Sequence, residues 1–439
     1  MNSSIFRAYD IRGIYPEEIN ERIAYQIGRA FAVYLKESET GMPEKIAVGR
    51  DARLSSPILL RSFISGVTRE GINVWDIGLV TVDAVYFVSG KYHLPAAMIT
   101  ASHNSKEWNG FKLVKSNVEF FAVKDLEIII NSKAPESTTI PKNGEITSEN
   151  IKTDYLKHVL SFVNVETIRP MRVAIDAGSG AVGPMLQSVL LKLPLEYTAM
   201  NFSPDGSFPA HEPDPTREKN LTDLINKMKS GHYHFGCAFD SDGDRIVFVD
   251  ENGESISSSI VAALMSRYFL SKTRDEKVVY SATVSCLIPE IVQIYNGEAT
   301  REKVGHTFIN RRLKEINGIF GVENSGHYFF RKNFYADSGI ISFLVMIGIL
   351  SDEKKGLSTL VSKLSKYFSV PEINFKVNMP EDFIKKIAQN FEGYDTDWLD
   401  GLTVRTSDFW LNLRPSSTEP LIRLNIEAKS ELVLNRVKD

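Results

Sequence analysis

The 439-residue chain contains little of what marks several classes of protein. Its two cysteines, Cys237 and Cys286, lie far apart beside apolar runs, so their spacing supplies neither a disulfide framework nor a metal site. The formal net charge is −4, and no excess of basic residues is available to neutralise a nucleic-acid backbone. The composition therefore predicts no nucleic-acid partner, while small charged ligands stay compatible with it.

Segments that direct a chain to a membrane are also lacking. The N-terminal stretch MNSSIFRAYDIRG has no basic segment followed by an apolar one, unlike a secretory signal. The longest apolar run, residues 339–350, is too short to span a bilayer and lies between Asp337 and Asp352. It predicts a buried helix. With so few cysteines, these features predict a cytoplasmic protein without a membrane partner; oligomerisation stays open.

The chain has an ordinary globular composition, with 43% hydrophobic residues. Within it, one pattern of residues occurs three times. Residues 45–66, 172–193 and 277–295 each read as a strand, a turn and a helix. A second apolar run follows each of them and ends in a polar loop, near residues 100, 240 and 323. Alternating strands and helices predict parallel sheets, whose ligands bind at the carboxyl ends of the strands.

The C-terminal part has a different pattern. Residues 402–428 alternate apolar and polar positions around a turn at 414–420, which predicts an antiparallel hairpin. The predicted fold class is therefore α/β, with three similar domains of mixed, mainly parallel sheets and a smaller C-terminal α+β domain. Polar, Pro-containing or Gly-containing stretches set the predicted domain boundaries. The four domains are residues 1–150, 151–253, 254–368 and 369–439.

The segment GSGAVG (178–183) matches the G-x-G-x-x-G fingerprint of dinucleotide binding between a predicted strand and helix. Glu196 lies near the spacing of a ribose-binding acid. A tight strand-to-helix turn requires glycine for steric reasons as well, so the match is weak in isolation. A nucleotide-dependent oxidoreductase is kept as an alternative.

The segment DSDGDR (240–245) places carboxylates at alternate positions in a loop. Anions this close repel one another unless a cation lies among them. An EF-hand would put Glu251 at its twelfth position, but the sixth position is Arg245 rather than glycine and the flanks are strand-like. The loop predicts a Mg²⁺ site facing a phosphoryl group, with a solvated polar turn as the alternative.

The segment TASHN (100–104) puts Ser102 beside His103 after an apolar run. In an extended loop adjacent side chains diverge, and G-x-S-x-G is absent, so a Ser-His hydrolase is disfavoured. A serine that accepts a phosphoryl group needs a cation and a proton carrier. DSDGDR supplies the first, and Lys112 or His103 the second.

Further loops carry candidate ligand-binding groups. In GVENSGH, a carboxylate and a hydroxyl suit sugar hydroxyls and an imidazole suits proton transfer, although a lone histidine is more often structural. In RPSSTEP, a guanidinium and hydroxyls suit one phosphate, although the same residues form an ordinary hairpin turn. YDIRG and GRDARLSS contain arginines that add positive charge at the same face as TASHN, although arginines at turns are usually solvated. These candidates are Glu323, Ser325 and His327; Arg414, Ser416, Ser417 and Thr418; and Arg12 in YDIRG with Arg50 and Arg53 in GRDARLSS.

In chain order, FRAYDIRG, TASHN with NGFK, DSDGDR, the Gly-His pair at 305–306, ENSGH and RPSSTEP resemble the motifs of the α-D-phosphohexomutases, phosphomannomutase/phosphoglucomutase branch. The resemblance covers nearly the whole chain. It implies a heart-shaped, four-domain enzyme with a central cleft that interconverts hexose 1-phosphates and hexose 6-phosphates. It further implies a phosphoserine enzyme, a hexose 1,6-bisphosphate intermediate that also acts as activator, Mg²⁺, and small sugar phosphates as the partners.

The resemblance also implies residue roles. It assigns the phosphoserine to Ser102, whose phosphate completes the metal site. The other roles are assigned to residues of the matching motifs. The Mg²⁺ ligands are Asp240, Asp242 and Asp244; charge stabilisation and proton transfer fall on Arg12, His103, Lys112, Arg245 and His327; substrate binding falls on Tyr9, His306, Glu323, Ser325, Arg414, Ser416, Ser417 and Thr418.

Two departures from the family pattern bear on substrate choice. Thr283 stands where many bacterial members have lysine, and Ser417 stands where Asn or Gly is common. Tyr9 and His306 favour the mannose/glucose branch over phosphoglucosamine mutase, which stays an alternative. A metal-dependent sugar phosphatase or bisphosphate synthase would use the same serine and aspartates and is a further alternative.

Overall fold

The structure is a computed structural model, and it describes residues 3–7, 9–38, 43–132, 143–416 and 421–438. Contacts divide the chain into two units. Unit 1 comprises Met1–Ser255 and Gly326–Leu357, and unit 2 comprises Ile256–Ser325 and Ser358–Asp439. The chain therefore passes from one unit to the other at three points. The four-domain division expected from the sequence stays a prediction.

The first sheet of unit 1 is mixed. Its strands, in spatial order, are β1 (Asp10–Ile14), β5 (Trp108–Val114), β4 (Ala96–Ile99), β2 (Lys45–Arg50), β3 (Asn73–Leu79) and β6 (Ile146–Ser148). The four strands β4, β2, β3 and β6 are parallel, whereas β5 and β1 are antiparallel additions. Because strand order reverses at β2, the carboxyl ends of β2 and β4 form a topological switch point, where α/β proteins bind ligands.

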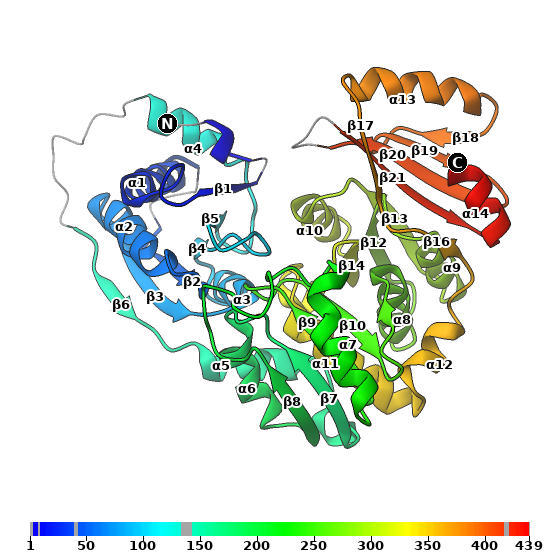
Figure 1. The fold of residues 1–439 in the computed structure, drawn as a ribbon. Coiled ribbons are helices and arrows are strands. Elements are labelled where there is room, and N and C mark those ends of the chain that lie inside the picture. Colours follow the sequence, from blue (N-terminus) through cyan, green and yellow to red (C-terminus); the bar gives the residue numbers. More distant parts are fainter. Residues whose placement is uncertain (1–2, 8, 39–42, 133–142, 417–420, 439) are drawn as a thin grey trace. The chain divides into compact units, whose positions relative to one another are not determined.

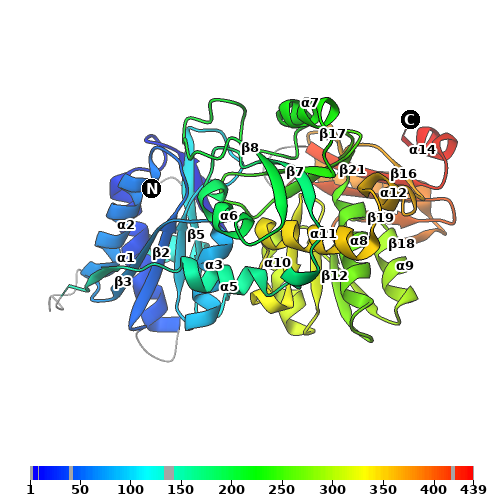
Figure 2. The ribbon, with the colours of Figure 1, turned by 90° about the horizontal axis from the view of Figure 1, so that it is seen from below.

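Helices cover both faces of this sheet (Figures 1 and 2). They are α1 (Glu21–Ser38), α2 (Ser56–Arg69), α3 (Val82–Tyr92) and α4 (Lys124–Asn131). Right-handed crossovers on either side of β2 place α2 and α3 on opposite faces. The close approach of α1 and α2 requires glycine, since a Cβ on Gly28 would lie 2.2 Å from the Phe63 carbonyl oxygen.

The second sheet of unit 1 has the spatial order β10 (Ile246–Asp250), β9 (Phe235–Phe239), β7 (Met171–Asp176) and β8 (Leu195–Met200). The pair β10 and β9 is antiparallel, and the others are parallel. Unit 1 further contains α5 (Lys152–Leu160), η2 (Val165–Thr167), α6 (Val182–Leu190), η3 (Glu218–Leu221), α7 (Thr222–Ser230), β15 (His327–Phe330) and α11 (Gly339–Glu353). The buried helix predicted over 339–350 is confirmed, because every residue from Gly339 to Ser351 is buried in α11. Among the described residues, no helix is long and apolar enough to cross a membrane.

Unit 2 contains a parallel group of strands, β13 (Glu298–Glu302), β12 (Lys277–Ser281) and β14 (Phe320–Glu323), with helices α8 (Ser258–Leu270), α9 (Leu287–Ile294) and α10 (His306–Glu315). Strand β11 (Ser255–Ile256) lies where the chain leaves unit 1. The predicted strand-turn-helix segments are thus confirmed as β2–α2, β7–α6 and β12–α9.

The rest of unit 2 is an antiparallel sheet with its own core. It contains β16 (Phe368–Ser369), β17 (Ile373–Lys376), β18 (Asp395–Asp397), β19 (Leu402–Arg405), β20 (Phe409–Pro415) and β21 (Leu421–Ala428). Helices α12 (Leu357–Ser362), α13 (Pro380–Ala388) and α14 (Glu431–Lys438) accompany it. The predicted hairpin is confirmed by the pairing of β20 with β21. The predicted fold class, mixed α/β sheets with a smaller C-terminal α+β part, is therefore confirmed.

Candidate active site

Ser102 lies in the turn between β4 and β5, at the switch point of the first sheet. The residue is 1% exposed and has a left-handed backbone, φ 50°. Its N–H donates to Thr100 Oγ1 at 2.9 Å, and its carbonyl accepts from Ser241 Oγ at 2.7 Å. Left-handed backbone is unfavourable for a residue with a Cβ, so these bonds stabilise a strained turn.

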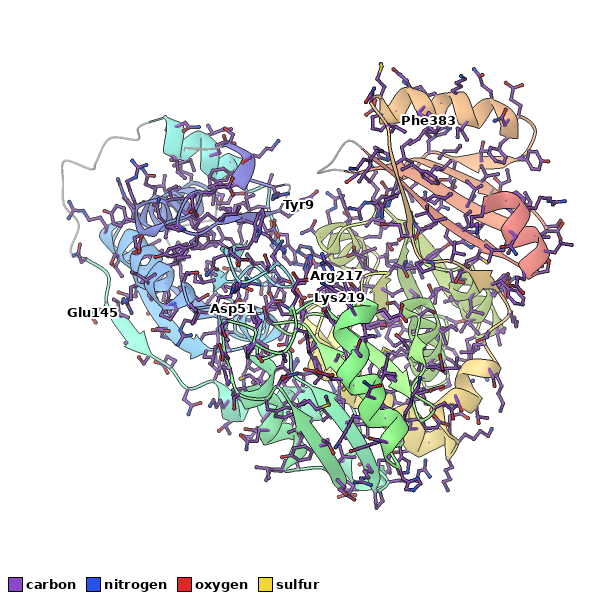
Figure 3. All side chains as sticks on the ribbon, in the orientation of Figure 1. Tyr9, Asp51, Glu145, Arg217, Lys219 and Phe383 are labelled. Atoms are coloured by element: carbon purple, nitrogen blue, oxygen red, sulfur yellow. The ribbon has the colours of Figure 1, made fainter. Side chains whose placement is uncertain are left out.

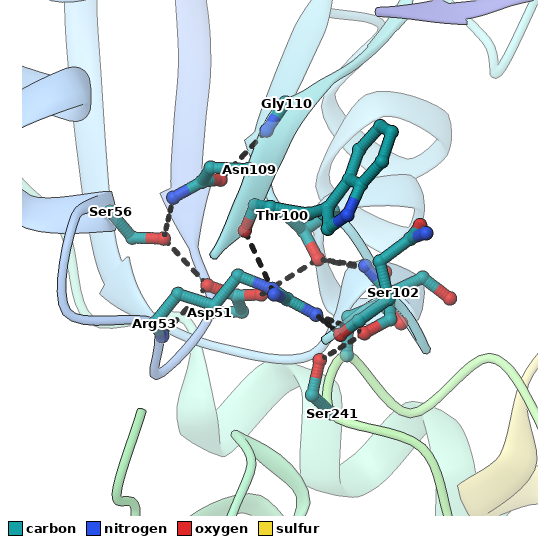
Figure 4. A network of polar contacts seen from close by, with 12 residues as sticks. Asp51, Arg53, Ser56, Thr100, Ser102, Asn109, Gly110 and Ser241 are labelled. Atoms are coloured by element: carbon teal, nitrogen blue, oxygen red, sulfur yellow. Dashed lines mark hydrogen bonds and ion pairs between the residues drawn. The ribbon is translucent and has the colours of Figure 1, made fainter. Parts of the chain in front are cut away.

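Arg53 donates hydrogen bonds that stabilise this turn (Figure 4). Its side chain is fully buried and pairs with Asp51, Nε to Oδ2 at 3.1 Å. Its remaining N–H groups donate to backbone carbonyls at 2.6–2.8 Å, those of Ser102, Asn104, Ser105 and Trp108. Desolvation lowers the pKa of Arg53 despite the opposing effect of Asp51. The sequence interpretation treated this arginine as added surface charge; the structure instead makes it an internal support.

The carboxylates of DSDGDR lie in the loop between β9 and β10, as expected from the sequence. Asp240, Asp242 and Asp244 are all buried, and one oxygen from each lies within 4.8 Å of the others. Burial, and then the neighbouring Asp244 and Asp242, raise the pKa of Asp240 well above its usual range. The loop is not a solvated polar turn.

Asp240 also contacts the serine directly. Ser102 Oγ donates to Asp240 Oδ2 at 2.8 Å, while the N–H groups of Gly243 and Arg245 donate to Asp240 Oδ1. Asp242 Oδ1 is buried and has no hydrogen-bond partner among the described residues. A buried carboxylate oxygen without a donor, among two other carboxylates, fits the oxygen-ligand preference of a divalent cation such as Mg²⁺.

Lys112, on β5, supplies positive charge to this cluster. Its Nζ donates to Asp242 Oδ2 at 2.8 Å and also pairs with Asp244. Desolvation lowers the pKa of Lys112, but the two carboxylates outweigh it and hold the pKa well above the usual value. The side chain is therefore an ammonium at neutral pH. Arg12, on β1, lies nearby and donates from Nη1 to Asn104 Oδ1 at 2.7 Å.

His103 lies closer to Ser102 than the sequence interpretation expected. The divergence of adjacent side chains holds for an extended loop, but the left-handed Ser102 turns the chain and brings His103 Nδ1 to 3.2 Å from Ser102 Oγ. That expectation was wrong. Desolvation, followed by the charges of Arg245 and Arg12, lowers the pKa of His103 well below its usual value. The imidazole is therefore neutral at pH 7.

His327, on β15, reaches the same cluster. Its Nε2 lies 3.3 Å from Asp244 Oδ1 and 3.9 Å from Asp337 Oδ2. An antiparallel bridge joins His327 to Arg245 at the end of the carboxylate loop. Burial raises the pKa of Asp337 to about 7. The sequence did not predict that Asp337 lies beside His327 and Asp244. It identified this residue only as a flank of the apolar run.

The remaining predicted substrate residues lie in unit 2 or at the start of unit 1. Glu323, at the end of β14, is buried, and His306 is the first residue of α10. Arg414, on β20, donates from Nη2 to Glu372 at 3.1 Å. Tyr9, labelled in Figure 3, is half-buried just before β1. Ser325 follows β14 and Ser416 follows β20, whereas Ser417 and Thr418 lie outside the described residues.

The glycines of GSGAVG are explained by close packing against protein backbone. A Cβ on Gly180 would lie 2.2 Å from the Ser241 carbonyl oxygen, and one on Gly183 would lie 2.0 Å from that of Phe202. Gly178 has a φ of +58°. The fingerprint therefore reflects how the β7–α6 turn packs against neighbouring loops, including the carboxylate loop.

Comparisons with known proteins identify the family of the chain. Four consecutive family models, described as phosphoglucomutase/phosphomannomutase alpha/beta/alpha domains I, II and III and the C-terminal domain, match residues 3–137, 153–253, 257–367 and 372–439. A phosphomannomutase of Methanocaldococcus jannaschii is 34% identical over 430 residues, which is 97% of this chain and 94% of the relative. A phosphoglucomutase of Neisseria meningitidis is 33% identical, covering 99% of this chain and 95% of the relative.

A solved structure has the same fold. A phosphoglucomutase/phosphomannomutase family protein from Burkholderia thailandensis superposes with a TM-score of 0.90 at 28% identity, covering 99% of this chain and 95% of that one. The sequence matches span nearly the whole chain and carry the same family description throughout. The chain belongs to the phosphoglucomutase/phosphomannomutase family.

Proposed function

We propose that the protein is a phosphohexomutase that interconverts hexose 1-phosphate and hexose 6-phosphate, with mannose or glucose phosphates as substrates. One observation carries the proposal: the buried hydroxyl of Ser102 lies directly on the carboxylate cluster, 2.8 Å from Asp240. A serine destined to carry a phosphoryl group needs positive charge beside it, which this cluster would hold as a bound cation. The names of the relatives, phosphomannomutase and phosphoglucomutase, support the same activity.

Asp240, Asp242 and Asp244 would hold Mg²⁺, together with the phosphate of Ser102. The orphaned Oδ1 of Asp242 and the burial of all three carboxylates support this assignment. When bound, Mg²⁺ neutralises phosphoryl oxygens and so assists their transfer. The cationic Lys112, Arg12 and Arg245 add to that charge stabilisation from this chain's own residues.

The chemistry of the proposed reaction balances over two transfers. In the first, a sugar hydroxyl attacks the phosphorus on Ser102, the P–Oγ bond of Ser102 breaks, and the sugar gains a second phosphate. The proton of the attacking hydroxyl passes to an imidazole, for which His103, 3.2 Å from Ser102 Oγ, and His327, 3.3 Å from Asp244, are the candidates. In the second, Ser102 Oγ attacks the other phosphoryl group of the hexose 1,6-bisphosphate and the bond between that phosphorus and the sugar oxygen breaks. The sugar oxygen takes up the proton held by the imidazole, which leaves the isomeric monophosphate. The same bisphosphate would activate unphosphorylated enzyme.

Further residues carry the proposed substrate binding. Glu323 and Ser325 would bind sugar hydroxyls, and Tyr9 and His306 would favour mannose or glucose. The phosphate that does not react would bind to the RPSSTEP segment, through Arg414, Ser416, Ser417 and Thr418. Guanidinium binds phosphate through two hydrogen bonds, which suits Arg414 for this role. Sugar phosphates in solution are the proposed partners, and the cytoplasm is the proposed location.

Assays with purified protein test the proposal. Phosphate transfer is followed by ³¹P NMR on mannose 1-phosphate, glucose 1-phosphate and glucosamine 1-phosphate, each with Mg²⁺ and a catalytic amount of hexose 1,6-bisphosphate. A mutase forms the 6-phosphate and is stimulated by the bisphosphate without consuming it. Release of inorganic phosphate would identify a phosphatase, net accumulation of bisphosphate a synthase, and turnover of glucosamine phosphate alone a phosphoglucosamine mutase.

A further inference from the structure

The hydroxyl of Thr100 meets three groups that belong to different parts of the site, two of which, Asp51 and Ser102, are seen in Figure 4. Thr100 directly follows β4 and is 1% exposed. Its Oγ1 accepts the N–H of Ser102 at 2.9 Å, lies 2.8 Å from Asp51 Oδ2 and lies 3.2 Å from Asp242 Oδ2. One atom therefore touches the serine turn, a buried internal carboxylate and a carboxylate of the proposed metal site.

The arrangement fixes where this hydroxyl can be. A hydroxyl has one proton to donate, and the shorter distance assigns that proton to Asp51, which leaves the lone pairs for the Ser102 N–H. Asp51 is itself fixed, because Ser56 Oγ donates to its Oδ1 at 2.6 Å and Arg53 Nε to its Oδ2 at 3.1 Å. Because these bonds hold Asp51 in place, Thr100 Oγ1 has a defined position next to the backbone N–H of Ser102.

The Thr100 hydroxyl also contacts the carboxylate loop. Asp242 Oδ2 lies between Thr100 Oγ1 and Lys112 Nζ, whereas Asp242 Oδ1 has no hydrogen-bond partner among the residues described. Lys112 Nζ donates to Oδ2 and so orients the carboxylate, which leaves Oδ1 free to bind a cation. Thr100 Oγ1, whose proton goes to Asp51, touches the same Oδ2 and limits how closely this oxygen approaches the serine turn. Thr100 thus touches both the turn that presents Ser102 and the Asp242 carboxylate.

We propose that Thr100 is a positioning residue, whose hydroxyl sets the distance between Ser102 and the Asp242 carboxylate. This inference rests on the proposed phosphoryl transfer at Ser102. Without the hydroxyl, the buried N–H of Ser102 would lose its acceptor and the left-handed turn would relax. A displacement of about 1 Å in the reacting group is enough to cost on the order of a hundredfold in rate.

Three variants test the role of the hydroxyl. Thr100→Val keeps the shape of the side chain and removes the hydroxyl, and Thr100→Ser restores it. Thr68→Val is the matched control, because Thr68 is also buried in unit 1 but its hydroxyl donates to the Ile64 and Ser65 carbonyls of its own helix, α2. Each protein is assayed for kcat and KM, for Mg²⁺ affinity by calorimetry, and for amide hydrogen exchange at residues 100–104 without Mg²⁺.

We expect Thr100→Val to lower kcat by about tenfold or more with KM changed by less than about threefold, while Thr100→Ser stays within about threefold of wild type. Amide exchange at Ser102 should accelerate in Thr100→Val only, and its Mg²⁺ affinity should fall. The inference is overturned if Thr100→Val matches wild type, if Thr100→Ser is as impaired as Thr100→Val, or if Thr68→Val loses as much kcat. Lack of mutase activity in wild type would instead contradict the proposed function; the exchange and Mg²⁺ measurements would still test the contacts of Thr100.

Discussion

Ser102 and Asp240 come from the ends of strands in two different sheets, and the hydroxyl of one donates to the carboxylate of the other at 2.8 Å. Both sheets belong to unit 1. The serine and the carboxylates are therefore brought together by the folding of unit 1, through the contact of its β4–β5 turn with its β9–β10 loop.

Replacing Ser102 by alanine should reduce mutase activity by at least about a thousandfold, because alanine has no hydroxyl to carry the phosphoryl group. Intact-mass spectrometry should show one added phosphate on wild type after incubation with hexose 1,6-bisphosphate and none on Ser102→Ala. The exposed Ser132→Ala serves as control and should keep both activity and the phosphate. Phosphorylation of the Ser102→Ala protein would contradict the assignment.

Removal of the metal should abolish activity reversibly. After treatment with EDTA, added Mg²⁺ should restore turnover in wild type. Asp242→Asn should weaken Mg²⁺ binding by at least about tenfold in calorimetry, because a neutral amide replaces a charged oxygen ligand. Asp223→Asn, at an exposed position in the first turn of α7, is the charge-matched control. Equal Mg²⁺ affinity in the two variants would exclude Asp242 from the metal site.

Arg53→Met should destabilise the fold, because it leaves Asp51 without its ion-pair partner and four backbone carbonyls without these donors. We expect a loss of about 3–5 kcal/mol in the free energy of unfolding. Arg61→Met, on the exposed face of α2, should change it by no more than about 0.5 kcal/mol. Chemical denaturation followed by circular dichroism measures both, and equal stability would show that the Arg53 contacts are dispensable.

The stability of unit 1 should depend on pH through His211. Its Nε2 lies 3.0 Å from Asp176 Oδ2, and this hydrogen bond raises the pKa of His211 above its usual 6.5. A histidine whose pKa is raised on folding stabilises the protein fully below pH 6.5 and loses that contribution as the pH rises through the folded pKa. The free energy of unfolding should therefore fall over this interval.

His211→Gln should flatten that part of the pH profile, while the exposed His232→Gln should leave it unchanged. The measurement is denaturant unfolding at intervals between about pH 5 and pH 8.5. Because Phe208 of the same long loop lies with its ring 5.2 Å from the Arg53 guanidinium, hydrogen exchange at residues 102–108 should also increase in His211→Gln. An unchanged pH profile in this variant would rule out the His211–Asp176 pair as its source.

Local patterns in the sequence were sufficient for much of the fold. The segments β2–α2, β7–α6 and β12–α9 each carry their own strand, turn and helix signals, so no tertiary information was needed to predict them. The carboxylate loop was predictable for a similar reason: three acidic residues at alternate positions between apolar strands are costly without a cation. The apolar run at 339–350 was too long for a strand and too short for a membrane span.

Other features depend on distant parts of the chain. Nothing local distinguishes Arg53, which is buried beneath the serine turn, from Arg50 three positions earlier at the end of β2. The contact of His103 with Ser102 follows from a left-handed backbone that is held by Thr100 and Ser241, and Ser241 lies 139 residues from Ser102. The role of GSGAVG likewise became clear only from the backbone atoms that its glycines face.

The position of α11 in unit 1 has a consequence for the order of events during protein synthesis. This helix packs on β10 and α5, yet the ribosome produces it only after the first segment of unit 2, Ile256–Ser325. Until α11 emerges, the apolar surface that it covers has no partner from its own unit. The nascent chain must therefore hold an incomplete unit 1 while unrelated residues are being added, which makes this interval the one in which a chaperone would be most useful.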